Sequence, residues 1–151
     1  MNKKLIILFM ILLIVIVGCS NKSEIRIEDI EKIQLELVEI QNMDDGTEYH
    51  IKLLNESDYV IKQNIVHFEY PIKLDNGIKE NKYKIEATNN RLNIQPDEEV
   101  MLYVFAPFEG MSENQTLALD DPSVMLKGYL EEVNEEYMFS IGRILTLNHS
   151  E

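Results

Sequence analysis

The sequence of 151 residues contains one cysteine, no tryptophan and only three histidines. Because Cys19 stands alone, no disulfide can form within the chain, and a zinc site built on several thiolates is excluded. Basic residues are also few: 14 Lys and Arg stand against 27 Asp and Glu, which gives a formal net charge of −13. Without a basic patch to neutralise phosphates, the chain is not expected to bind nucleic acid.

The usual motifs of nucleophilic catalysis are absent as well. Such catalysis needs a Ser, Cys or Thr with a base within hydrogen-bonding reach. His50 and His67 fall in predicted strands, and His149 lies in the last three residues. There is no Gly-x-Ser-x-Gly elbow, no Ser-x-x-Lys motif and no glycine-rich phosphate loop. We therefore expect a protein that is not an enzyme, with no catalytic residue and no cofactor.

Two acidic turns offer the only support for a metal site. Asp44-Asp45-Gly46-Thr47-Glu48 carries three carboxylates, which hard cations such as Ca²⁺ can use, and Asp97-Glu98-Glu99 forms a second acidic corner. The first turn lacks the Asp-x-Asp-x-Asp-Gly pattern and the distant Glu of an EF-hand. No His or Met cluster has ligand spacing for a transition metal. We interpret both segments as solvated acidic turns and assign no metal ligand.

The amino-terminal segment is the strongest signal in the sequence. Thirteen unbroken apolar residues, Leu5 to Val17, follow a positive start with Lys3 and Lys4. A helix of that length spans about 20 Å, short of the roughly 30 Å hydrocarbon core of a bilayer. A positive start followed by a short apolar run is typical of a signal peptide, which is favoured here over a membrane-spanning helix.

The apolar run ends in Ile16-Val17-Gly18-Cys19, which resembles the lipobox of bacterial lipoproteins. All four positions fit, with Ile16 where Leu is commoner. The resemblance implies cleavage before Cys19, a diacylglyceryl group on its thiol, and attachment at the outer face of the cytoplasmic membrane. Two acyl chains suffice for stable anchoring. The predicted organisation is a signal peptide (1–18), a lipidated cysteine and tether (19–32), and one exported domain (33–151). The alternative is an uncleaved anchor beside an incidental cysteine.

Alternating apolar residues predict short strands along the exported part. Residues 25–40 are ambiguous, and we favour a strand from Ile33 to Ile40 after an irregular or short helical lead. Asp75-Asn76-Gly77 is a strong hairpin turn signal, and residues 108–122 are expected to form a long loop. Seven or eight strands with frequent turns predict an all-β sandwich. The other expected strands lie at Tyr49/Ile51/Leu53, Val66/Phe68/Tyr70, Tyr83/Ile85/Ala87, Leu92/Ile94, Val100 to Ala106, Val124 to Leu130 and Tyr137/Phe139/Ile141.

Two segments resemble immunoglobulin-like bacterial surface domains. The stretch from Leu92 to Val104 is similar to their E–F region, in which a strand, a Pro-plus-acidic corner and another strand follow one another. The stretch from Leu53 to Ser57 resembles the end of their B strand. The resemblance covers about a third of the chain and implies an immunoglobulin-like β-sandwich. The Cys…Trp…Cys core of antibody domains is absent.

Two surface features are candidates for recognition. Glu131, Glu132, Glu135 and Glu136 flank the predicted final turn, either as a charged hairpin tip or as a patch for a basic partner. Phe105 and Phe108 flank Pro107 at a strand end, either as an apolar loop patch or as part of the core.

The expected function is that of a non-enzymatic binding or accessory module, anchored at the membrane, with an envelope or membrane protein as its partner. This expectation combines the lipid anchor, the sandwich pattern and the missing catalytic motifs. The alternatives are a metal-dependent hydrolase with a site built from acidic loop residues, and a structural spacer in an envelope complex. Fold class alone does not separate these functions.

The lipobox yields a direct prediction. Cys19→Ala removes the thiol that would carry the lipid, so this variant should lose both lipid labelling and normal processing. Metabolic labelling with a fatty acid and mass spectrometry of the cell-associated protein measure these effects. An unchanged mass and unchanged membrane retention would contradict the assignment.

Overall fold

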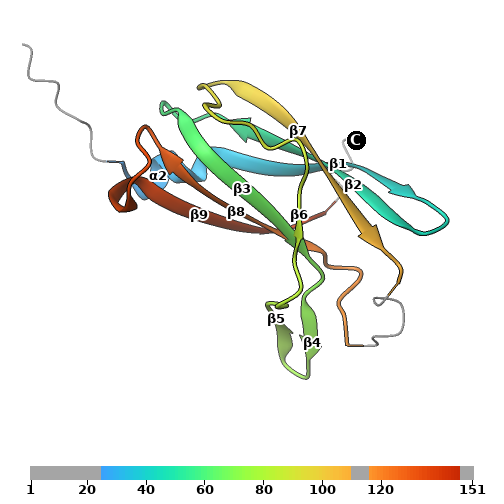
Figure 1. Cartoon of the computed structure of the whole chain (residues 1–151). Helices are drawn as coiled ribbons and strands as arrows, with labels where there is room; N and C mark the ends of the chain where they lie inside the picture. The colour runs from blue at the N-terminus through green and yellow to red at the C-terminus, as the bar shows by residue number, and fades with distance from the viewer. Residues whose placement is uncertain (1–24, 110–115, 147–151) are drawn as a thin grey trace, which may run out of the picture.

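The computed structural model describes residues 25–109 and 116–146 (Figure 1). The signal peptide, the lipobox at Ile16 to Cys19, and His149 lie outside the described residues. The described part is an all-β structure with very little helix, as the alternation of apolar residues predicted. Its strands form antiparallel sheets stacked in a sandwich-like arrangement.

Nine strands build two main sheets and one small hairpin, against the seven or eight strands that we expected. The first sheet has the order β1-β2-β7, the second has the order β6-β3-β8-β9, and β4 and β5 pair with each other. The elements are α2 (Ile27–Glu31), β1 (Ile33–Asn42), β2 (Gly46–Asn55), β3 (Ile61–Glu69), β4 (Ile72–Leu74), β5 (Gly77–Lys79), β6 (Ile85–Glu86), β7 (Glu98–Pro107), β8 (Ser123–Leu130), the 3₁₀ turn η1 (Glu135–Tyr137) and β9 (Met138–Ile144).

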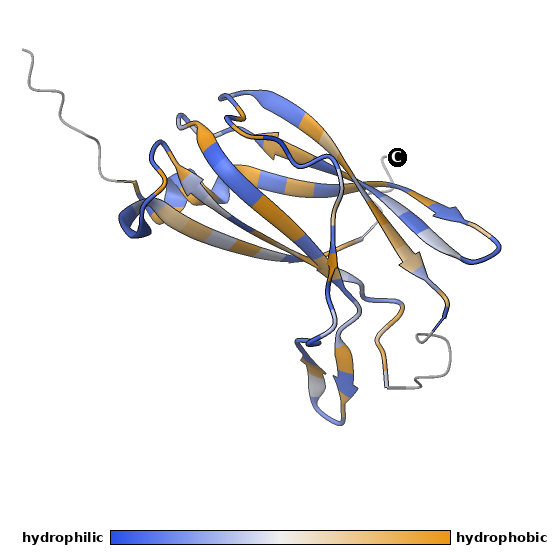
Figure 2. Ribbon diagram, viewed as in Figure 1, coloured by the Kyte–Doolittle hydropathy of each residue, from blue (hydrophilic) through white to orange (hydrophobic). Residues whose placement is uncertain are grey.

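The core lies between the two main sheets. Each long strand turns every second side chain inward, since successive side chains of a strand point to opposite faces. Ile51 and Leu102 of the first sheet, and Phe68 and Leu126 of the second, are fully buried. Figure 2 shows the resulting alternation of hydrophobic and hydrophilic residues along the strands. This alternation explains why the sequence pattern identified the long strands correctly.

Several local predictions are confirmed. A short helix, α2, leads into β1, and Ile25 before the helix and Ile30 within it pack against the core, so the folded unit begins before Ile33. The hairpin turn ends at Gly77, whose φ of 131° is readily adopted only by glycine. The described part of the long loop, Thr116 onward, contacts β4 through a bridge between Leu117 and Ile72.

Two expected strands are wrong. The strand expected at Tyr83/Ile85/Ala87 is reduced to Ile85–Glu86, and Tyr83 is 76% exposed. The strand expected at Leu92/Ile94 is absent: Leu92 is 66% exposed, and Ile94 makes only an isolated bridge to Ile61. The physical reason is that this stretch forms hydrogen bonds with one sheet and then with the other, so it does not pair continuously with either.

We call residues 85–94 the crossing segment. It pairs first with β3, where Ile85 lies opposite Phe68 and the Ala87 N–H donates to the Val66 carbonyl at 2.8 Å. At Thr88 it reaches the other sheet, where the Thr88 N–H donates to the Tyr103 carbonyl of β7 at 2.8 Å. It then returns to β3. The segment thus covers one edge of each sheet and closes that side of the core.

A buried asparagine holds one end of the sandwich together. The Asn55 side chain is fully buried, and its amide donates to the carbonyls of Tyr59, Ile94 and Gln95 at 2.9–3.2 Å. Its carbonyl oxygen accepts from the Ser57 hydroxyl at 2.7 Å. Buried polar groups cost free energy unless they are paired, so this network fixes both loops that it joins. It links the two stretches singled out in the sequence, 53–57 and 92–104.

The strand registers define two ends of the sandwich. The helix end holds α2, the β2–β3 loop, the corner before β7 and the β8–β9 turn. The far end holds the β1–β2 turn, the end of β3 and the end of β7. A ten-residue strand such as β2 is about 33 Å long, which sets the separation of the two ends.

The core yields a matched pair of substitutions. Leu102→Ala removes a fully buried side chain and should lower the free energy of unfolding by roughly 2–5 kcal/mol. Leu92→Ala makes the same chemical change at an exposed position and should cost less than about 0.5 kcal/mol. Urea denaturation followed by circular dichroism measures both. Equal costs for the two variants would contradict the assigned core.

Candidate binding site

The four predicted acidic residues lie together at the β8–β9 turn, at the helix end, and all four are exposed. One of them has a structural role that the sequence did not reveal. The Glu131 carboxylate accepts a hydrogen bond from the Val60 N–H at 2.8 Å and so holds the β2–β3 loop. Asn134 organises the tip, since its side-chain oxygen accepts from the Glu136 N–H at 3.0 Å. The patch is therefore partly a structural turn.

Residues of the two acidic turns also form hydrogen bonds and an ion pair with other parts of the domain. At the corner before β7, the Asp97 N–H donates to the Asn55 carbonyl, and Glu98 forms a 2.7 Å ion pair with Arg91. At the β1–β2 turn, the Asp45 carbonyl accepts from the Phe108 N–H at 2.9 Å. Within residues 25–109 and 116–146, no three or more His, Cys, Asp or Glu residues are grouped so as to hold a metal ion.

His50 lies on the outer face of the first sheet, between two carboxylates. Its Nδ1 is 3.1 Å from Glu39 and its Nε2 is 2.7 Å from Glu48, while its ring meets the Tyr103 ring edge-on at 5.0 Å. His67 lies on β3, opposite Glu86 of β6. Among the described residues, no hydroxyl or thiol is hydrogen-bonded to either histidine. Glu39, His50 and Tyr103 are thus side-chain neighbours across adjacent strands of the first sheet.

A pocket of about 680 Å³ lies at the far end. It lies where β3 ends, where the chain enters the crossing segment, and beside the end of β7. Residues from all three places line it, among them Phe68, Tyr70, Tyr83 and Phe105. Pockets of roughly 300–1,000 Å³ with apolar walls and a few polar groups are typical of ligand sites. This pocket has the size and walls of a binding site.

A pair of tyrosines supports the inner wall of the pocket. The Tyr49 and Tyr70 hydroxyls are 2.6 Å apart and join β2 to the residue that follows β3, while the Phe68 ring contacts both tyrosine rings. Burial raises the pKa of both hydroxyls, and the hydrogen bond between them raises the pKa of Tyr70 further. Both tyrosines therefore stay neutral across the physiological range.

The rim of the pocket carries the polar groups. Glu69 accepts from the Asn81 N–H at 3.1 Å, and Asn81 donates its side-chain amide to the Tyr70 carbonyl at 3.0 Å. Lys84 lies 3.9 Å from Glu69 and is hydrogen-bonded to Glu80, whose pKa it lowers. Among the described residues that line the pocket, Lys84 is the only basic one, against Glu69 and Glu109. The rim is therefore net negative.

The sequence pointed to this site only in part. Phe105 and Phe108 are both exposed, so they do not belong to the core, and of the two only Phe105 lines the pocket. Tyr83 was assigned to a strand. A usable signal did exist: Phe68-Glu69-Tyr70-Pro71 and Phe105-Ala106-Pro107 are both aromatic strand ends closed by proline, and both ends meet at the far end.

Comparison with known proteins leaves the site to be interpreted from its geometry. No protein-family model matches the sequence, and no similar sequence is found among curated proteins. Over the described ranges, no helix combines the length and the apolarity that crossing a membrane requires.

The tyrosine pair predicts how stability depends on pH. Because both pKa values are raised in the folded state, their contribution is fully present below about pH 10 and is lost as the pH rises through the unfolded-state pKa and beyond. The free energy of unfolding should therefore fall above pH 10. In the double variant Tyr49→Phe/Tyr70→Phe this fall should be smaller, whereas Tyr83→Phe, at an exposed position, should leave it unchanged. Urea titrations at a series of alkaline pH values provide the test; a double variant with the wild-type pH dependence would refute the role of the pair.

Proposed function

We propose that this chain is a lipid-anchored lipoprotein of the bacterial cell envelope, and that its domain is a non-enzymatic binding module. The observation that carries the proposal is the aromatic-lined pocket at the far end. It lies one strand length from the end where the chain from Cys19 joins the domain. The expected partner is an envelope or membrane protein.

An immunoglobulin-like topology is part of this proposal. If β1, β2, β3, β6, β7, β8 and β9 are named A, B, C, C′, E, F and G, the sheets read A-B-E and C′-C-F-G. Sandwiches of this family divide their strands in a similar way, and the C′ strand of variable domains joins the sheet of C, F and G. In this naming the corner at Pro96 lies before strand E, whereas the sequence resemblance implied a corner between strands E and F.

The proposed anchor gives the module an orientation. Cys19 precedes Ile25 by six residues, which span about 20 Å at most. A lipid on Cys19 would hold the helix end near the bilayer and present the pocket outward. The acidic tip at Glu131, Glu132, Glu135 and Glu136 would face the membrane, where its charge repels anionic head groups. This arrangement favours recognition at the far end over recognition at the acidic tip.

The electrostatics favour binding over hydrolysis. A hydrolase with a general acid needs a carboxyl group whose pKa is raised. The pKa of Asp29 is lowered by a hydrogen bond from the Arg26 N–H, and that of Glu80 is lowered by Lys84. At the pocket, Glu69 is occupied by hydrogen bonds from Asn81 and Ser123. These carboxylates are arranged as structural acceptors.

The proposal is tested with small aromatic fragments. Ligand-observed NMR with the full-length protein in nanodiscs should detect weak binders, because the pocket offers apolar walls. Tyr83→Ala removes one exposed wall and should weaken binding roughly 3- to 10-fold, the effect of losing one aromatic contact. Leu92→Ala, at an exposed position outside the pocket lining, is the matched control. Fragments that bind Tyr83→Ala as well as the wild type would place the site elsewhere.

A further inference from the structure

The outer edge of β7 is only partly covered. At Tyr103 the N–H donates to the Thr88 carbonyl at 3.3 Å, and the carbonyl accepts from the Thr88 N–H at 2.8 Å. Both peptide groups of Tyr103 therefore point away from β2, toward the crossing segment. Two residues earlier, the Met101 carbonyl points the same way and accepts from the Asn89 side chain at 2.6 Å. The crossing segment thus provides hydrogen-bond partners for the outward peptide groups of β7 as far as Tyr103.

At Phe105 no described residue pairs with this edge. Peptide groups alternate along an antiparallel strand, so the N–H and carbonyl of Phe105 point to the same side as those of Tyr103. By that point the crossing segment has left for β3, where Ile85 lies opposite Phe68. No hydrogen bond from another described residue reaches the peptide groups of Phe105. Because β7 stays paired with β2 as far as Pro107, this open edge keeps strand geometry.

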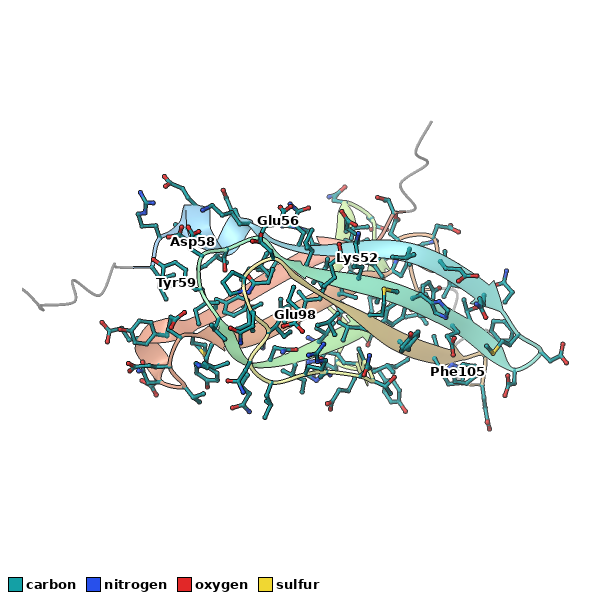
Figure 3. All side chains as sticks on the ribbon, turned by 90° about the horizontal axis from the view of Figure 1, so that it is seen from above. Lys52, Glu56, Asp58, Tyr59, Glu98 and Phe105 are labelled. Atoms are coloured by element: carbon teal, nitrogen blue, oxygen red, sulfur yellow. The ribbon has the colours of Figure 1, made fainter. Side chains whose placement is uncertain are left out.

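The Phe105 ring does not cover its own edge. It lies over Gly46 of β2, on the opposite side of β7, so closely that a Cβ atom on Gly46 would be 2.5 Å from the ring. Glycine is therefore required at position 46 for this packing. Figure 3 shows Phe105 close to the end of β7. The open peptide groups and the pocket are adjacent, since Phe105 also lines the pocket.

We propose that the pocket and the open edge of β7 together bind an extended polypeptide segment of a partner protein. The segment adds as a strand at Phe105 and places one large apolar side chain in the pocket. A basic residue beside that side chain faces Glu109 at the rim. This inference rests on the proposed function, because it names the partner chemistry of the same site.

Two observations favour a polypeptide over a small apolar ligand. A small ligand fills the pocket but leaves the peptide groups of Phe105 unpaired, whereas a strand satisfies both. In strand addition the main-chain hydrogen bonds supply affinity and pockets for alternate side chains supply specificity. The net negative rim, in a chain of net charge −13, favours a segment with basic residues.

The test uses an array of synthetic nine-residue peptides, acetylated and amidated, with Leu, Ile, Phe or Tyr at the centre and Lys, Ser or Glu at the flanking positions. Peptides with a central apolar residue and a flanking Lys should bind the full-length protein in nanodiscs, and the Glu series should not. The best peptide is then N-methylated at one position at a time. Methylation at alternate positions should weaken binding about tenfold or more, as expected for lost hydrogen bonds, and the intervening positions should have little effect.

The outcomes separate this inference from the proposed function. Fragments that bind the pocket while no peptide binds would overturn strand addition and leave the binding module intact. Strand addition would also be overturned if N-methylation weakened peptide binding equally at alternate and at intervening positions. Self-association of the protein through this site, seen by sedimentation and lost in Tyr83→Ala, would replace the partner protein with a second copy. Failure of Tyr83→Ala to affect any fragment or peptide would reject the proposed function itself.

Discussion

The fold depends on one segment that forms hydrogen bonds with an edge of each sheet. Residues 85–94 pair with β3 at Ile85, with β7 at Thr88, and again with β3 at Ile94. Two stacked sheets have unpaired peptide groups along their shared side, and leaving such groups unsatisfied over a hydrophobic core is costly. The crossing segment removes most of this cost. The pocket lies where this segment begins, beside the ends of β3 and β7.

The two ends of the sandwich consequently differ in character. At the helix end, Asn55 ties the β2–β3 loop to the corner before β7, and the Glu131 carboxylate ties the same loop to the β8–β9 turn. The polar groups there form hydrogen bonds that hold the loops together. At the far end, aromatic residues meet under a rim of charged side chains, and the edge of β7 ends without a neighbour among the described residues. The hydrogen-bonded loops and the pocket thus lie at opposite ends of the sandwich.

Sequence reasoning succeeded where structure follows from neighbouring residues. The strands at Val100 to Ala106 and Val124 to Leu130 follow from alternation alone, and the hairpin at Gly77 follows from its backbone freedom. The strand predictions at Tyr83 and Leu92 failed, because hydrogen bonds to two distant strands determine the course of the chain there. The pocket was missed for the same reason, since its walls come from four separate parts of the chain. The lipobox at Ile16 to Cys19 lies outside the described residues and stays a prediction.

Amide hydrogen exchange along β7 tests the central claim most directly, because it reports the pairing of each peptide group in the free protein. The amides of Val104, which faces β2, and Tyr103, which pairs with Thr88, should be protected. The amide of Phe105, which follows Val104 in the same strand but points away from β2, should exchange much faster than either. If Phe105 is as protected as Tyr103, the edge is closed, and the proposed site for an added strand does not exist.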